Sequence, residues 1–139
     1  MPLIITDTNN YTKSFNKSIL QKILKKSIAF LNLSNKEIHI NFISDYRMKK
    51  LNTEFRSIYQ TTDVLSFFYD DTYNNIYGEI FISLKYCEKN IKKNGNTLIK
   101  ELSILCIHGF LHLLGHDHDS PEKERKMFQL QEKIYRKSE

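Results

Sequence analysis

The sequence predicts an α+β fold in which residues 1–139 form a single domain. Two kinds of pattern favour it. Segment 37–43, EIHINFI, alternates apolar and polar residues as a half-buried strand does, and 76–82, IYGEIFI, follows a polar reversal as the second arm of a hairpin. Other segments repeat apolar residues at the spacing of amphipathic helices. A chain of this length can enclose one core without dividing into domains.

The N-terminal half is expected to hold two strands and two helices. A short strand, LIIT, occupies 3–6, and an amphipathic helix begins at Ser14. Its buried side is marked by apolar residues at helical spacing: Phe15, Ile19, Ile23, Leu24, Ile28 and Leu31. After strand 37–43, Ser44 can cap a second helix. The inward side of that helix is expected to be Met48, Leu51 and Phe55.

The next segments predict a hairpin and then a short helix. A strand begins at Val64, after an irregular polar stretch that contains Arg56 in a loop. Residues 70–75, DDTYNN, form the reversal into strand 76–82. Ser83 can cap a short helix, which Gly95 would end.

Two further helices complete the chain. Thr97 starts a long apolar helix that carries Glu101 and two histidines. Ser120 followed by Pro121 is a typical cap and first-turn pair, so a last helix is expected to begin there. Its core side is predicted to be Met127, Leu130, Gln131 and Ile134.

The composition is that of an ordinary soluble globular protein, with 40% apolar and 27% charged residues. The formal net charge of +5 is a weak indication of a polyanionic partner. Cys87 and Cys106 have no CxxC spacing, which fits buried thiols in a reducing compartment. No secretory signal is visible, so a cytoplasmic location is expected. The most apolar segment, 98–115, contains charged residues and histidines and predicts a buried helix, not a membrane span.

The strongest chemical signal is the segment 108–118, HGFLHLLGHDH. His108 and His112 lie four residues apart, so on a helix both imidazoles project from one face. Gly115 can take the left-handed conformation that ends a helix and turns the chain back. That turn can bring His118 in as a third ligand. Three imidazoles with an open fourth position are what one catalytic Zn²⁺ ion requires.

Gly109 bears on whether the expected metal site hydrolyses peptides or another substrate. In zinc peptidases with this spacing, a glutamate beside the first histidine is the general base. Here that place is a glycine, which argues against ordinary proteolysis. A zinc-bound water, with its pKa lowered to about 7, can still be partly hydroxide without such a base.

Each histidine could instead be a core residue hydrogen-bonded to the backbone. Four of the five histidines fall within eleven residues, which favours the metal site. His116 could compete as a ligand, and Asp117 could orient an imidazole or cap the turn. The fifth, His39, alternates away from the apolar side of its strand and is expected to be exposed. Arg56, judged from the residues alone, could be a surface arginine or a phosphate-binding fork.

The chain resembles the YbeY family of bacterial rRNA-processing endoribonucleases. The resemblance rests on four stretches: HGFLHLLGHDH, LNTEFRSIYQTTDVLSF at 51–67, GEIFIS at 78–83 and KMFQLQE at 126–132. It implies a mixed, mostly four-stranded sheet flanked by helices, with a zincin-like metal helix at the centre. It also implies zinc ligands at His108, His112 and His118, and catalytic roles for both Arg56 and His108. Thr61 and His116 depart from the family pattern without removing a ligand.

The resemblance further implies cleavage of single-stranded RNA, maturation of the 3′ end of small-subunit (16S) rRNA and a part in ribosome quality control. The partners it implies are single-stranded rRNA, the small ribosomal subunit and ribosome-assembly proteins; neither a membrane nor DNA is expected. Two other functions stay open. One is a non-enzymatic assembly factor whose zinc only stabilises the fold. The other is a metallopeptidase or different metal hydrolase, which Gly109 opposes.

Overall fold

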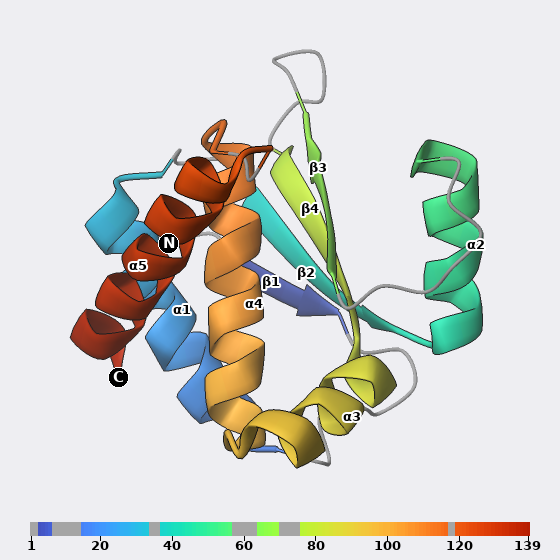
Figure 1. Cartoon of the computed structure of the whole chain (residues 1–139), viewed down its shortest axis with the longest axis horizontal. Helices are drawn as coiled ribbons and strands as arrows, with labels where there is room; N and C mark the ends of the chain where they lie inside the picture. The colour runs from blue at the N-terminus through green and yellow to red at the C-terminus, as the bar shows by residue number, and fades with distance from the viewer. Residues whose placement is uncertain (1–2, 7–14, 34–36, 57–63, 70–75, 117–118) are drawn as a thin grey trace.

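The computed structural model describes residues 3–6, 15–33, 37–56, 64–69, 76–116 and 119–139. They form one four-stranded sheet and five helices (Figure 1). The strands are β1 (Leu3–Thr6), β2 (Glu37–Ile43), β3 (Val64–Phe68) and β4 (Ile76–Ser83). The helices are α1 (Lys17–Leu31), α2 (Asp45–Arg56), α3 (Leu84–Asn94), α4 (Leu98–Leu113) and α5 (Pro121–Ser138). This confirms the predicted α+β class.

The sheet is mixed, in the strand order β1-β2-β4-β3. β1, β2 and β4 run parallel, with Ile40 opposite both Ile5 and Ile80. β3 is antiparallel to β4, as the predicted hairpin requires, and places Ser66 opposite Ile80. The reversal at 70–75 lies outside the described residues. Parallel neighbours need crossover connections, and helices supply them here.

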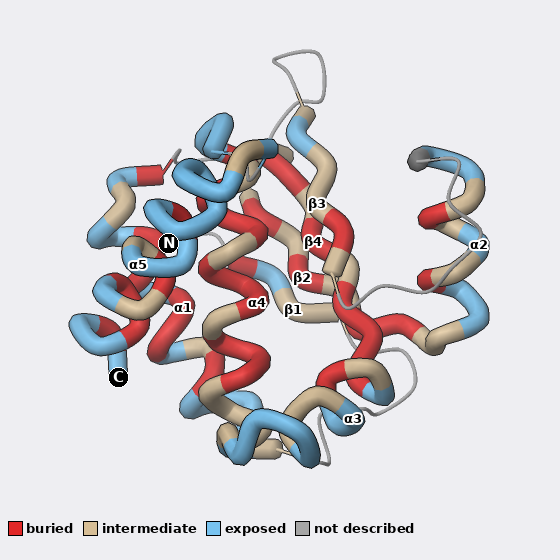
Figure 2. Tube along the Cα trace, viewed as in Figure 1, coloured by how far each residue is buried: buried red, intermediate tan, exposed pale blue. Residues whose placement is uncertain are grey.

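The two faces of the sheet are covered unequally. α1, α4 and α5 pack together on one face, whereas α2 lies on the other (Figure 1). The main core lies on the first face, where Ile38, Ile40 and Phe42 meet apolar residues of the three helices. The second face holds a small separate cluster of Ile43, Met48 and Leu65 with Leu51, Phe67 and Phe81 against it. Figure 2 shows the same contrast, with buried residues concentrated on the strands and along α4.

The predicted helix boundaries are largely confirmed by their caps. The side chains of Ser83, Thr97 and Ser120 accept hydrogen bonds from the backbone N–H groups three residues on. Ser44 does the same for the N–H of Arg47 at the start of α2. Gly95 ends α3 with a positive φ of 75°, the conformation for which glycine has no steric penalty.

Three expectations were wrong. α1 begins at Lys17 with Asn16 as its cap, and Ile19 is 47% exposed because the buried stripe starts one residue later, at Leu20. Phe55 is 62% exposed, since the second face of the sheet meets α2 mainly through Met48. Arg56 is the last residue of α2 and not part of a loop.

None of the described helices is both long enough and apolar enough to cross a bilayer.

Candidate metal centre

The site is built on α4, the most deeply buried helix. Thr97 caps it, and Glu101 in its first turn accepts hydrogen bonds from the side chains of Asn94 and Asn96. Burial raises the pKa of the Cys106 thiol, so this sulfur stays protonated and belongs to the core. Cys87 is equally buried. These contacts fix the helix that presents His108 and His112.

Gly109 lets α4 approach the sheet closely. A Cβ atom on Gly109 would lie 2.7 Å from Cδ1 of Ile80 and 3.0 Å from Oγ of Ser66. Both distances are shorter than ordinary carbon contacts. The position at which a zinc peptidase carries its glutamate therefore packs against side chains of β3 and β4, which would have to shift to admit a longer side chain. Gly109 therefore permits close packing of α4 on the sheet, and it also leaves this position without a general base.

His108 and His112 are brought together as the spacing predicted. Their Nε2 atoms are 2.9 Å apart, and the two rings cross edge to face with centroids 4.5 Å apart at 80°. Both residues are half-buried on α4. The two imidazoles thus present the same nitrogen to one point.

The other ring nitrogens face oxygen acceptors. Nδ1 of His108 meets Oε1 of Gln131 on α5, and Nδ1 of His112 lies 3.0 Å from the backbone oxygen of His116. An amide or peptide oxygen only accepts, so a proton on Nδ1 lets each imidazole donate to its oxygen neighbour. In that tautomer both Nε2 lone pairs point toward each other, an arrangement that a cation bound to both would stabilise.

Gln131 is a site residue that the sequence analysis had placed in the core. It is only 7% exposed and lies on the buried side of α5, among the apolar residues Met127 and Ile134. A polar side chain on an apolar helical stripe needs a partner, and that was the signal available in the sequence. The partner is His108.

The turn after α4 supplies the second orienting group. Gly115 has a positive φ of 93°, as predicted, and its N–H donates to the carbonyl of His112 at 3.0 Å. The N–H of His116 donates to the carbonyl of Leu111 at 3.0 Å, which folds the chain back over the helix end. His116 therefore contributes its carbonyl, and its side chain is exposed.

The remaining predicted site residues are not described. His118 and Asp117 lie outside the described residues, as does Thr61. Arg56 ends α2, and its side chain is likewise outside the described part. Among the side chains that are described, no group of three His, Cys, Asp or Glu residues could hold a metal ion. The fifth histidine, His39, was wrongly expected to be exposed: it is half-buried, because it pairs with Glu37 at 3.1 Å on the sheet.

A hollow opens beside His108. Its volume is about 250 Å³, and α5 supplies the other lining residues: Glu124, Met127, Phe128 and Gln131. The hollow thus borders one histidine of the pair and the side chain that orients it. Small-molecule and substrate sites are commonly concave spaces with a few placed polar groups.

Residues 4–139 match the family model described as Endoribonuclease YbeY. The chain belongs to the YbeY family. The resemblance expected from the histidine segment is therefore confirmed for almost the whole chain.

Similar proteins agree with this assignment. A protein of Sulfurihydrogenibium sp. named Endoribonuclease YbeY is 40% identical over 138 residues, covering 96% of this chain and 91% of that protein. One of the same name from Persephonella marina is 41% identical over 128 residues, covering 88% and 84%. The solution structure of TM1509 from Thermotoga maritima is 28% identical with a TM-score of 0.67, covering 98% of this chain and 88% of that one. The YbeY fold predicted from the sequence is thus also found in a solved structure.

Proposed function

We propose that this YbeY-family chain is a zinc-dependent endoribonuclease that cuts single-stranded RNA. The observation that carries the proposal is the convergence of Nε2 of His108 and Nε2 of His112 at 2.9 Å, with both Nδ1 atoms facing oxygen acceptors. Neutral imidazoles oriented by outer hydrogen bonds are typical zinc ligands. The names of the similar proteins support the choice of RNA as substrate.

In this proposal His108, His112 and His118 hold one Zn²⁺ ion. The ion supplies Lewis acidity toward a phosphodiester when it is bound. Gln131 and the His116 carbonyl keep the two helical imidazoles in the binding tautomer. Arg56 binds the phosphate, because its planar guanidinium matches two phosphate oxygens and offsets charge that develops on them.

The packing of Gly109 disfavours a peptidase. A general base at this position would need a side chain where Ile80 and Ser66 already lie. Phosphodiester cleavage does not demand that base, since positioning and charge stabilisation make the larger contribution in phosphoryl chemistry. The site therefore suits RNA better than peptides.

We further propose that the substrate is the 3′ precursor of small-subunit (16S) rRNA and that the protein serves in ribosome quality control. The partners would be single-stranded rRNA, the small subunit and ribosome-assembly proteins, within the cytoplasm. The net charge of +5 supports a polyanionic partner. No role at a membrane or on DNA is proposed.

The test is cleavage of a single-stranded RNA that carries the ribosomal 3′ precursor sequence. Wild type, His112→Ala and Arg56→Ala are purified identically, and zinc content is measured in each. We expect His112→Ala to lose zinc and cutting together, and Arg56→Ala to keep zinc and lose cutting. Chelation of the wild type should abolish cutting, and added Zn²⁺ should restore it.

His39→Ala is the matched control, because this histidine pairs with Glu37 on β2. It should retain both zinc and activity. Equal cutting by all four preparations would reveal a contaminating nuclease and overturn the proposal. Folded, zinc-loaded wild type that binds RNA without cutting it would instead favour an assembly factor with a structural zinc.

A further inference from the structure

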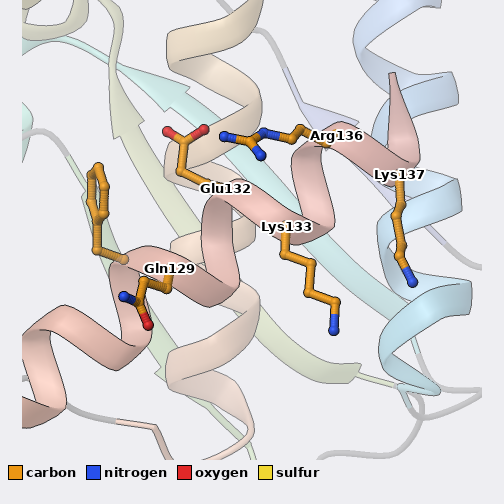
Figure 3. Close-up of a pocket in the computed structure, with 6 residues that line it drawn as sticks. Gln129, Glu132, Lys133, Arg136 and Lys137 are labelled. Atoms are coloured by element: carbon orange, nitrogen blue, oxygen red, sulfur yellow. The ribbon is translucent and has the colours of Figure 1, made fainter.

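The exposed side of α5 extends from the hollow beside His108. Phe128 lines that hollow together with His108, and it also lines a second hollow of about 440 Å³. The other residues around the second hollow all come from the same helix: Gln129, Glu132, Lys133, Arg136 and Lys137 (Figure 3). Phe128 is thus common to both hollows. It is 59% exposed, so its ring is accessible to a ligand.

The second hollow is basic. Lys133, Arg136 and Lys137 stand against a single carboxylate, that of Glu132. Figure 3 shows Glu132 and Arg136 pointing toward each other on one side of the helix, while Lys133 projects from the other side. Nζ of Lys137 lies 4.7 Å over the ring of Phe30 on α1, which fixes the far end of the hollow. The remaining positive charge faces solvent and suits an anionic ligand.

We propose that Phe128, Lys133 and Arg136 form an RNA track. This track leads single-stranded RNA to His108 and His112, the proposed metal ligands. One base stacks on the exposed ring of Phe128, and neighbouring phosphates lie against the two cations. The proposal rests on the endoribonuclease function proposed above. Sequence-tolerant binding of single strands commonly combines an aromatic platform with a positive groove, and both occur here on one helix.

The dimensions fit a short stretch of strand. Residues 128 and 136 are separated by about 12 Å along the helix axis, from a rise of about 1.5 Å per residue. That length corresponds to about three nucleotides at a stacked spacing of about 3.4 Å. The strand would therefore contact the track at several nucleotides before one phosphodiester reaches His108.

The test compares two track variants with two matched controls. The track variants are Phe128→Ala and the double change Lys133→Glu with Arg136→Glu. The controls are Tyr46→Ala, an aromatic residue that is 75% exposed on α2, and Lys25→Glu with Lys26→Glu on the exposed side of α1. Zinc content and far-ultraviolet circular dichroism are checked for every protein. Each is then assayed by steady-state cleavage and by fluorescence anisotropy with the same labelled single-stranded RNA.

We expect Phe128→Ala to raise KM and the dissociation constant about tenfold, the loss typical of one stacked base, with the effect in KM and not in kcat. The double charge change should weaken binding more and should lower the slope of log affinity against log salt by about 0.7 for each phosphate that the protein no longer neutralises. Both controls should bind RNA as wild type does.

The outcomes separate this proposal from the one before it. Wild-type cleavage with unchanged KM and affinity in both track variants would overturn the track and leave the endoribonuclease function standing. Wild type that binds RNA without cutting, with weaker binding in the track variants, would overturn the enzymatic function and support the track. Equally weakened binding in track variants and controls would show a general charge effect and also overturn the track.

Discussion

The two faces of the sheet hold the two halves of the proposed site with very different support. On one face, α4 is packed between the sheet, α1 and α5, and its two histidines are oriented by a buried side chain and a backbone carbonyl. On the other, α2 carries Arg56 and meets the sheet through the small cluster around Met48. The proposed metal ligands are therefore preorganised by the main core, whereas Arg56 depends on a helix that is anchored only locally.

One polar contact adds to that anchor. Oγ of Ser83, which caps α3, hydrogen-bonds the Asp45 carboxylate at the first residue of α2. Near the other end of α2, beside Arg56, the exposed ring of Phe55 meets Phe67 of β3 edge to face. Local stability should fall along α2 toward Arg56, because an exposed ring contact holds a helix end less firmly than buried contacts do.

Filling the contact at Gly109 is expected to destabilise the packing of α4 on the sheet. Gly109→Ala places a methyl group 2.7 Å from Cδ1 of Ile80, and overpacking of this kind lowers the free energy of unfolding by about 1–3 kcal/mol. The better helix propensity of alanine offsets at most about 1 kcal/mol. Gly109→Glu should be worse, since a carboxylate would also be buried. Urea denaturation measures both variants.

Gly95→Ala is the matched control for the change at Gly109. Nothing lies within 4 Å of an added Cβ at this residue, although its φ of 75° introduces some strain. The free energy of unfolding should fall by about 1 kcal/mol, the difference between glycine and alanine in this conformation. A Gly109→Glu protein as stable as wild type would show that α4 can move away from the sheet, and the packing argument against a peptidase would fail.

Met48→Ala tests the independence of the two halves. Met48 is fully buried in the second cluster, and truncation of such a side chain costs about 2–5 kcal/mol. We expect the amides of α2 to lose hydrogen-exchange protection while those of α4 keep it. RNA cutting should fall and zinc affinity should not.

Met127→Ala is the matched change on the sheet face that carries His108 and His112. Met127 is 3% exposed and lines the hollow beside His108. Its truncation should cost a similar free energy of unfolding and should weaken zinc binding as well. Zinc affinity that falls equally in both variants would mean that α2 and α4 unfold as one unit, and the contrast between the faces would disappear.

The sequence predicted most features of the sheet face that carries His108 and His112, and few features of the face that carries Arg56. The spacing of His108 and His112, the turn at Gly115 and the caps of α3, α4 and α5 are local features, so a single segment encodes them. Phe55 was misplaced because periodicity shows which residues share a side of a helix, not how much of that side the sheet covers. Gln131 was assigned to the core because its partner lies 23 residues away along the chain, a contact that only the packing of α4 on α5 creates.

Gln131→Leu is expected to weaken zinc binding 10–100-fold, as removal of an outer-shell partner typically does. The leucine keeps the volume but cannot accept from Nδ1 of His108, so the imidazole loses its fixed tautomer. Competition with a chromophoric chelator measures the affinity, and the absorption of the Co²⁺-loaded protein reports the ligand geometry. Gln131→Glu retains an acceptor and should restore tight binding.

Gln129→Leu is the control for that change, because Gln129 is exposed on the same helix. It should leave zinc binding unaltered. If Gln131→Leu binds zinc as tightly as wild type, the hydrogen bond to His108 is only a core contact, and the metal side is less preorganised than the contrast between the two faces requires.

The smallest expected effect is at Phe55, next to Arg56. Its exposed ring meets Phe67 of β3 edge to face, with centroids 5.2 Å apart, and such a pair contributes about 0.5–1.5 kcal/mol. Phe55→Ala should therefore lower stability by about 1 kcal/mol, reduce RNA cutting through looser placement of Arg56 and leave zinc affinity unchanged. Tyr46→Ala, at the anchored end of α2, should alter none of the three. A fall in cutting only in Phe55→Ala would locate the weak support of Arg56 at this ring pair; equal cutting in both would show that the last turn of α2 is held by other contacts.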